Sequence, residues 1–215
     1  MTAMPKSPLN KLPTRDRLLA SGHRAVIKHG FRTMTIREVA AGAHANLGSF
    51  VYHFGTREAF VEELMQRWYA PLLARVNKVA AEDGRPVGRL RSAILQLVDG
   101  VDNDVFLGRI LMAAADNDKF ARNFLKSLAR RHPLILLQLV AAAQADGALA
   151  DHDPMQVLCF LFSAAALPRL IATAWQGPSL FGEPLPAALS HVARDRDRMA
   201  QRLDWAIRGL ACGKP

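Results

Sequence analysis

Three short helices are predicted close together near the start of the chain, and their spacing limits the fold more than any other feature. They cover residues 14–29, residues 36–42, and the stretch from Asn46 to Gly55. Residues that start or stop helices mark their ends: Thr14, the T-x-x-E capping box of Thr35 and Glu38, Asn46, Gly30 and Gly55. Helices this short are unstable alone, so they must pack together as one small helical unit.

The third helix, within HANLGSFVYHF, divides its residues between two tasks. Phe50 and Phe54 are four residues apart, so they lie on one face and can pack against the first two helices. Gly48 has no side chain, which lets the free N–H groups of the helix N-terminus approach a phosphate. A short helix held by its apolar side behind a tight turn is typical of a helix-turn-helix, whose last helix enters the DNA major groove.

The excess positive charge is concentrated in the same part of the chain. Residues 1–60 hold nine Lys and Arg against three acids, a net +6, whereas residues 61–215 carry only +3 of the total +9. A polyanion is therefore the expected partner of the N-terminal part. The predicted organisation is a disordered basic arm over 1–13, a DNA-binding domain over 14–60, and a helical regulatory and dimerisation domain over 61–215.

Residues 14–60, TRDRLLASGHRAVIKHGFRTMTIREVAAGAHANLGSFVYHFGTREAF, resemble the N-terminal domain of TetR/AcrR transcriptional regulators. The likeness includes HGF after the first helix, T-x-R-E-V-A in the second, and G-S-F-x-Y-H-F-G-T-R-E-A from the third onward. The resemblance implies a larger all-helical domain that senses a ligand and dimerises. It also implies a repressor that an unknown small-molecule effector releases from DNA.

The resemblance further implies which residues contact double-stranded DNA, and Asn46 is added because its amide can donate to phosphate or base edges. The full set is Thr35, Arg37, Asn46, Leu47, Gly48, Ser49, Val51, Tyr52, His53 and Arg57. Simpler roles are open for some of them. Asn46 can serve only as a cap, Tyr52 only as a packed aromatic, and Arg37 as an ordinary surface charge.

Three departures from the family pattern are visible. Val51 stands where the family often has Tyr, so that contact is lost or passes to Tyr52. His44 stands where a turn Gly is usual, and His tolerates left-handed backbone geometry better than most residues. Gly22 and His23 stand where the first helix usually has apolar residues, which predicts a less stable DNA-binding domain.

The rest of the chain is predicted to be helical, because Ala and Leu are abundant and runs of strand-favouring residues are missing. A long helix begins after Thr56, and Pro71 within it removes the hydrogen bond to the Arg67 carbonyl, which predicts a kink or a break. Further helices are predicted over 88–100, 103–115, 117–131, 133–146, 154–175 and 190–210. The expected fold is all-α with about nine to ten helices.

Residues 154–175, PMQVLCFLFSAAALPRLIATAW, are apolar on nearly every face of a helix. Such a helix is buried on all sides, so one face is expected to meet the chain's own core and another a second copy. The predicted homodimer interface consists of Phe160, Ala164, Leu167, Ile171, Leu203 and Trp205. A dimer would present two heads, matching a pseudo-palindromic operator.

Large apolar residues of the body are candidates for an effector pocket, although plain core is their commoner role. Arg109 interrupts an apolar run and is expected to pair with an anionic ligand or with Asp116 or Asp118. The candidate ligand residues are Phe106, Arg109, Ile110, Met112 and Phe162.

An enzyme and an architectural or recombination DNA-binding protein are the alternative interpretations. No Ser–His–Asp set, Gly-rich phosphate loop or helical pair of carboxylates is found, so no catalytic residue and no cofactor is expected. The best metal candidate, Asp151–Asp153, lacks the i, i+4 His spacing of a helical site, and a helix cap at Asp153 explains it. The nearly neutral body argues against an architectural role.

Nothing in the sequence predicts export or a membrane span. The start, MTAMPKSPLNKLP, lacks the apolar core of a signal peptide, and the longest apolar stretch falls short of the roughly 20 residues that cross a bilayer. Cys159 and Cys212 form no CxxC pair, which fits a reducing compartment better than a disulfide framework or a zinc site. A soluble cytoplasmic protein is expected.

Overall fold

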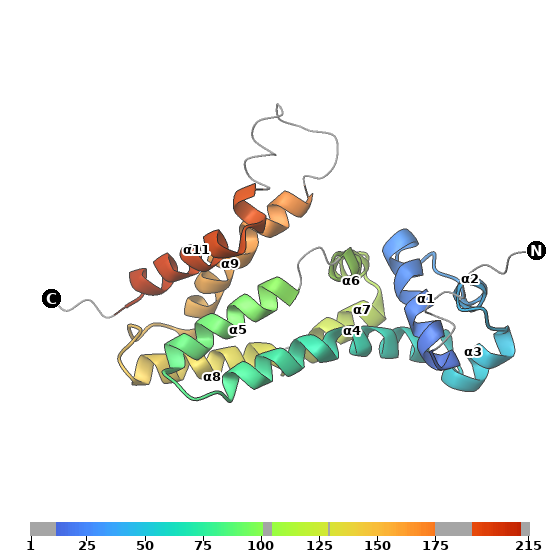
Figure 1. The fold of residues 1–215 in the computed structure, drawn as a ribbon, viewed down its shortest axis with the longest axis horizontal. Coiled ribbons are helices and arrows are strands. Elements are labelled where there is room, and N and C mark those ends of the chain that lie inside the picture. Colours follow the sequence, from blue (N-terminus) through green and yellow to red (C-terminus); the bar gives the residue numbers. More distant parts are fainter. Residues whose placement is uncertain (1–11, 101–104, 129, 175–190, 212–215) are drawn as a thin grey trace, which may run out of the picture. The chain divides into compact units, whose positions relative to one another are not determined.

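The computed structural model describes residues 12–100, 105–128, 130–174 and 191–211 of the chain, and within these residues it contains helices and turns but no strand. Figure 1 shows the helices in chain order. They are α1 (Thr14–His29), α2 (Ile36–Gly42), α3 (Leu47–Phe54), α4 (Arg57–Ala80), α5 (Pro86–Gly100), α6 (Val105–Ala115), α7 (Lys119–Leu128), α8 (His132–Ala145), α9 (Pro154–Ala174) and α11 (Arg196–Gly209). The predicted all-α class is confirmed. Most of the predicted basic arm, residues 1–11, lies outside the described residues.

Local capping residues fix most of the predicted helix starts. The N–H of Glu38 donates to Thr35 Oγ1 at 3.2 Å, and the N–H of Ser49 donates to Asn46 Oδ1 at 2.7 Å. The predicted cap at Thr14 is wrong: Thr14 is already the first helical residue, and Pro13 occupies the N-cap position without a side-chain bond. The Thr14 hydroxyl instead accepts a bond from Arg17 Nη2 at 3.3 Å.

The chain divides into two compact units. Unit 1 comprises Met1–Ala70 with Asp104–Ser127, and unit 2 comprises Pro71–Asn103 with Leu128–Pro215. The boundary falls inside α4, which remains one continuous helix through Pro71, so the break considered for that position does not occur. Helices α6 and α7 group with α1–α3 in unit 1.

An aromatic cluster joins the helices of unit 1. The ring of Phe106, from α6, is fully buried and stacks on His23 of α1 with 4.7 Å between ring centroids. Trp68 of α4 and Phe31, from the turn after α1, lie 5.7 and 5.4 Å from the same ring. Burying these rings together attaches α6 to both α1 and α4.

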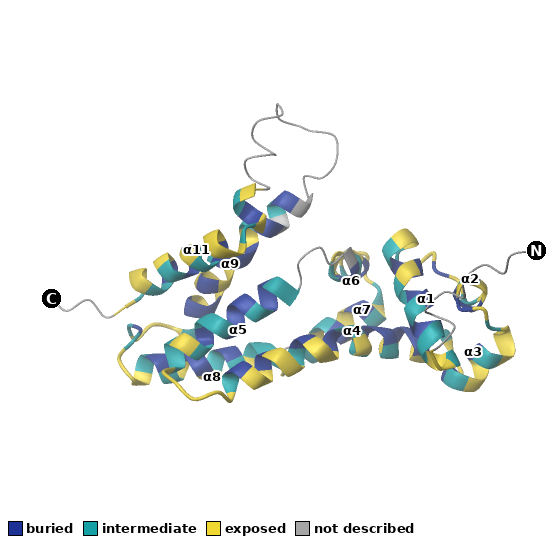
Figure 2. Cartoon of the chain, viewed as in Figure 1, coloured by how far each residue is buried: buried dark blue, intermediate teal, exposed yellow. Residues whose placement is uncertain are grey.

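Charged side chains connect the helices of unit 2. Arg91 of α5 donates through Nε and Nη2 to the two carboxylate oxygens of Asp204 of α11, at 2.5 and 2.9 Å. This bidentate pair lowers the pKa of the Asp204 carboxyl. Arg169 of α9 is buried and donates to the carbonyl of Val98 at 3.2 Å. Figure 2 shows buried faces in dark blue and exposed residues in yellow along these helices.

Candidate DNA-binding interface

Helix α3 has one buried side and one exposed side. Phe50 and Phe54 are buried, and their rings lie 5.3 Å apart and within 5.0 Å of Phe60 at the start of α4. Tyr52 is 85% exposed, and Leu47 and Val51 are exposed beside it. Figure 2 shows this exposed side of α3 in yellow. Burying the two phenylalanines fixes the helix while the opposite side remains available for a groove.

The N-terminus of α3 is exposed, and its cap leaves little room for a side chain at position 48. Gly48 is exposed, and a Cβ atom there would lie 3.3 Å from Asn46 Oδ1, which caps the helix. A side chain at position 48 would therefore crowd the cap as well as keep a phosphate away from the backbone N–H groups. The capping role predicted for Asn46 is confirmed.

The turn between α2 and α3 requires left-handed geometry at His44, whose φ is +50°. The N–H of His44 donates to the carbonyl of Ala41 at 3.0 Å, and the N–H of Ala45 donates to that of Ala40 at 2.9 Å. These bonds satisfy carbonyls at the end of α2, as in helices that end on a left-handed residue. The expectation that His substitutes for the usual turn Gly is confirmed.

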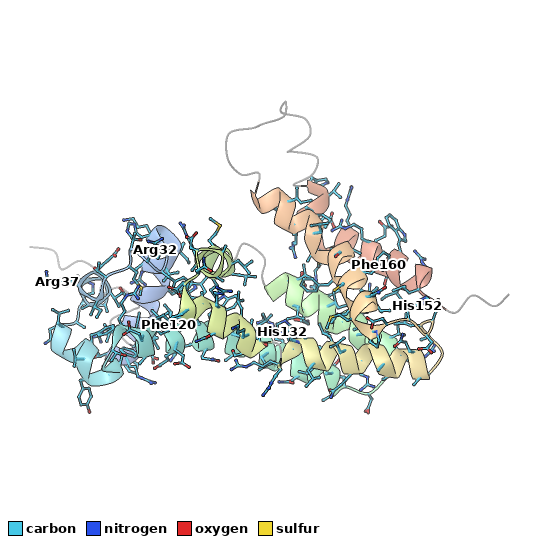
Figure 3. The ribbon with its side chains drawn as sticks, turned by 180° about the vertical axis from the view of Figure 1, so that it is seen from behind. Arg32, Arg37, Phe120, His132, His152 and Phe160 are labelled. Carbon is cyan, nitrogen blue, oxygen red and sulfur yellow. The ribbon has the colours of Figure 1, made fainter. Side chains whose placement is uncertain are left out.

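Of the other predicted contact residues, Arg37 is exposed on α2 (Figure 3). No acid of the described residues pairs with it. His53 is half-buried, with its ring 5.1 Å from Tyr52. Thr35 and Arg57 also have internal roles. The Thr35 hydroxyl caps α2, and Arg57 Nη2 donates to the carbonyl of Phe31. These roles leave the exposed residues of α3 and Arg37 as the most available groups.

Two glycines allow the helices behind α3 to approach closely. A Cβ on Gly22 of α1 would meet the ring of Phe60, with Cε1 at 2.8 Å. A Cβ on Gly42 of α2 would lie 2.5 Å from the hydroxyl of Ser21 of α1. The family pattern alone marks Gly22 and His23 as sources of instability. The structure gives Gly22 a packing role and places His23 against Phe106, and neither neighbour is visible in the local sequence.

The four candidate ligand residues of α6 differ in burial and in partners. Phe106 and Ile110 are fully buried in unit 1, and Met112 of the same helix is exposed. Arg109 pairs with neither Asp116 nor Asp118, and its Nε and Nη2 donate to the carbonyl of Ile27 at 3.2 and 3.0 Å.

Phe162, the fifth candidate, belongs to unit 2. It lines a cavity whose other lining residues all come from α8 and α9.

The candidate dimer residues separate by exposure. Phe160 and Leu167 of α9 are 51% and 50% exposed, and Trp205 of α11 is 55% exposed. Ala164 and Ile171 are intermediate. The prediction for Leu203 is wrong, because this side chain is fully buried in the core of unit 2 and cannot reach a partner.

Comparisons with known proteins agree with this architecture. A sequence model of the family described as "Bacterial regulatory proteins, tetR family" matches residues 18–64. The chain is 28% identical over 95 residues to the transcriptional repressor DhaR of Mycobacterium sp. (strain GP1), covering 42% of this chain and 48% of DhaR. It is 25% identical over 189 residues to the repressor NemR of Escherichia coli (strain K12), covering 83% and 92%. A third relative is the transcriptional repressor KstR2 of Mycobacterium tuberculosis. The matches to DhaR and KstR2 span about half the length of those two proteins.

Solved structures share this fold over more than nine-tenths of the chain. The crystal structure of reduced NemR from E. coli matches with a TM-score of 0.67 at 19% identity, over 93% of this chain and 98% of NemR. The structure of the ketosteroid regulator KstR2 of Mycobacterium tuberculosis matches with a TM-score of 0.64 at 19% identity, over 94% and 96%.

The described residues can also be compared with the requirements of a membrane span and of a metal site. None of their helices is both long and apolar enough to span a bilayer. They also contain no group of three potential His, Cys, Asp or Glu metal ligands. The helix-turn-helix and the family match at residues 18–64, together with the repressors that the chain resembles in sequence, support one conclusion: this is a regulator of the TetR/AcrR type.

Proposed function

We propose that this chain is a dimeric transcriptional repressor, which binds a pseudo-palindromic operator and is released from it by a small molecule. The observation that carries the proposal is the exposed side of α3, where Tyr52, Val51 and Leu47 face outward while Phe50 and Phe54 hold the helix from behind. Exposed apolar and aromatic groups gathered on one side of a short helix are typical of a surface that contacts a partner. The major groove offers thymine methyl groups and base edges to such side chains.

The electrostatics of unit 1 support the same partner. Its acids near α1 are paired: Glu63 with Arg15 at 2.7 Å and Asp16 with Arg67 at 2.7 Å. These acids are thus neutralised, and Arg37 has no pairing acid among the described residues. The Arg37 guanidinium is therefore free of a competing acid in the described part of the chain and available to bind a phosphate.

The proposed contact set is the exposed side of α3 with its N-terminus, Arg37, and the ends of α2 and α4. Its members are Thr35, Arg37, Asn46, Leu47, Gly48, Ser49, Val51, Tyr52, His53 and Arg57. Residues of α3 would read base edges, and the remainder would position the head on the phosphate backbone.

Dimerisation is proposed through the exposed apolar residues of α9 and α11. Phe160, Leu167 and Trp205 are about half exposed, and a second copy of the chain would cover these apolar side chains. Ala164 and Ile171 complete this dimer surface. Two-fold symmetry would place the same residues on both sides of the contact.

Release by an effector is proposed to act through α4. This helix runs from Arg57, which follows the helix-turn-helix, to Ala80 in unit 2, and the boundary between the two units falls within it at Ala70–Pro71. Pro71 lacks the N–H that would bond to the Arg67 carbonyl, so the helix is easiest to deform there. The protein would act in the cytoplasm, where its DNA is, and without catalysis.

DNA footprinting on the segment flanking the gene for this chain tests the proposal. We expect two protected half-sites, separated by about one or two helical turns of DNA, at protein concentrations on the order of nanomolar. Competitor DNA of random sequence should fail to remove the protection at moderate salt. If no duplex, including this flanking segment, is retarded even at low salt, the repressor proposal is wrong.

A further inference from the structure

A cavity of about 290 Å³ lies between the start of α8 and the middle of α9 in unit 2. Its walls are formed by His132, Pro133, Leu136, Leu158, Cys159, Phe162 and Ser163. Figure 3 shows the side chains of both helices, with His132 labelled at the first turn of α8 and Phe160 on α9. Of the lining residues, only Phe162 belongs to the candidate ligand set.

The cavity has a closed base and an open mouth. Leu136 and Leu158 are buried, whereas Cys159 and Phe162 are exposed. A small molecule can therefore enter from the side of α9. Once bound, it would cover the apolar part of the cavity wall that is exposed to water before binding. Removing such a surface from water is the main driving force for binding apolar ligands.

The wall carries polar groups but no formal charge at neutral pH. Its polar groups are the His132 imidazole, the Cys159 thiol and the Ser163 hydroxyl. Burial lowers the pKa of His132 to about 4, so the ring is neutral under ordinary conditions. A charged ligand would lose its hydration here and find no opposite charge in the wall, which is costly.

We propose that this cavity binds an uncharged, mainly apolar molecule of one or two rings, and that this molecule is the effector. The volume is at the small end of the range for ligand sites, about 300–1,000 Å³, which limits the ligand to that size. The effector role rests on the proposed function above, whereas occupation of the cavity does not.

The Cys159 thiol gives a direct measure of occupation. The full-length chain carrying Cys212→Ser would be alkylated with iodoacetamide, with and without 2-naphthol as a neutral two-ring probe. We expect saturating 2-naphthol to slow alkylation of Cys159 about tenfold, because a bound ligand covers most of the wall it contacts. The anionic analogue 2-naphthoate should bind at least about tenfold more weakly, since its charge has no partner in the cavity.

Two variants on the same helix provide the matched comparison. Ser163→Phe fills the cavity from an exposed position of α9 and should abolish protection of Cys159 by 2-naphthol. Gln156→Phe adds the same ring at an exposed position that does not line the cavity, and it should leave protection unchanged. Thermal unfolding of both variants checks that each is folded.

The outcomes separate the cavity from the proposed function. Loss of operator retardation on adding 2-naphthol, together with protection of Cys159, supports both site and effector role. Protection without release of DNA overturns the effector role. If 2-naphthol gives no protection, or if protection appears only in a variant made monomeric, the cavity is not a ligand site in the dimer. Continued operator binding in that case leaves the repressor function standing.

Discussion

The ring of Phe60 occupies the space that a side chain on Gly22 would need. A Cβ atom built on Gly22 would lie 2.8 Å from Phe60 Cε1 and closer still to Cζ. Phe60 also packs against Phe50 and Phe54, the two buried residues that anchor α3. The absence of one side chain in α1 therefore helps determine where α3 lies.

Replacing Gly22 with Ala should destabilise the protein by about 1–3 kcal/mol, because overpacking outweighs the roughly 1 kcal/mol that Ala gains over Gly in a helix. Urea unfolding measures the change. Gly108→Ala is the matched control: Gly108 lies in α6 of the same unit, and a Cβ there meets nothing within 4 Å. Gly108→Ala should be neutral or stabilising, and equal destabilisation by both variants would contradict the packing role of Gly22.

Arg109→Ala should cost about 1–2 kcal/mol, because the guanidinium bonds to an unsatisfied carbonyl at the C-terminal end of α1 and complements the helix dipole. This substitution removes the hydrogen bonds from Nε and Nη2 to the carbonyl of Ile27, at 3.2 and 3.0 Å. Lys at this position should restore only part of the stability, since its ammonium cannot form the same fork. Arg122→Ala, which removes an exposed bond to Asn117, should change the unfolding midpoint little.

Tyr52→Ala should weaken operator binding by roughly 1–3 kcal/mol without changing the free energy of unfolding, because the side chain is exposed. Binding is measured by titration of a labelled operator fragment. Leu134→Ala is the control, because Leu134 is 47% exposed on α8, outside the DNA-binding interface and the proposed dimer surface. Wild-type affinity of Tyr52→Ala would remove this residue from the contact set.

Arg37→Ala should reduce the dependence of binding on salt. If Arg37 contacts a phosphate, the slope of log K against log salt becomes smaller in magnitude by about 1. The measurement is a series of operator titrations at increasing potassium chloride concentration. An unchanged slope with weaker binding would instead indicate a contact of Arg37 to a base edge.

Replacing Ala164 and Trp205 together with Glu should convert the dimer into a monomer, because two charges would enter each half of an apolar contact. Static light scattering gives the mass directly. Glu at Gln138 and Ala141, which are exposed on α8 outside the proposed dimer surface, serves as a control with the same added charge. A double variant at 164 and 205 that stayed dimeric would exclude the proposed dimer surface.

Stability should fall on acidification through the range in which His132 titrates. Burial lowers its folded pKa from 6.5 to about 4, so between these values the unfolded chain binds a proton that the folded chain does not. The part of the free energy of unfolding that depends on neutral His132 is fully present above about pH 6.5. It declines towards about pH 4, by at most roughly 3 kcal/mol. Urea unfolding at a series of pH values, compared between wild type and His132→Gln, isolates this residue. Parallel curves for the two proteins would contradict the assignment.

Features that depend on neighbours in the chain were accessible from the sequence. The caps at Thr35 and Asn46 bond to N–H groups three residues ahead, so the starts of α2 and α3 follow from local chemistry. The four-residue spacing of Phe50 and Phe54 likewise set the buried side of α3, and hence the exposed side of the candidate interface. Thr14 is the exception, because Pro13 takes the N-cap position.

Features that depend on residues distant in the chain were decided only by the tertiary structure. Leu203 and Trp205 are both apolar residues of one helix, yet packing within unit 2 buries the first completely and leaves the second half exposed. Arg109 finds its partner at Ile27, 82 positions away, rather than in the nearby acids. The cavity at His132 exists because α8 and α9 meet there. The periodicity of a sequence specifies which side of a helix is apolar, but the choice of neighbour belongs to the three-dimensional packing.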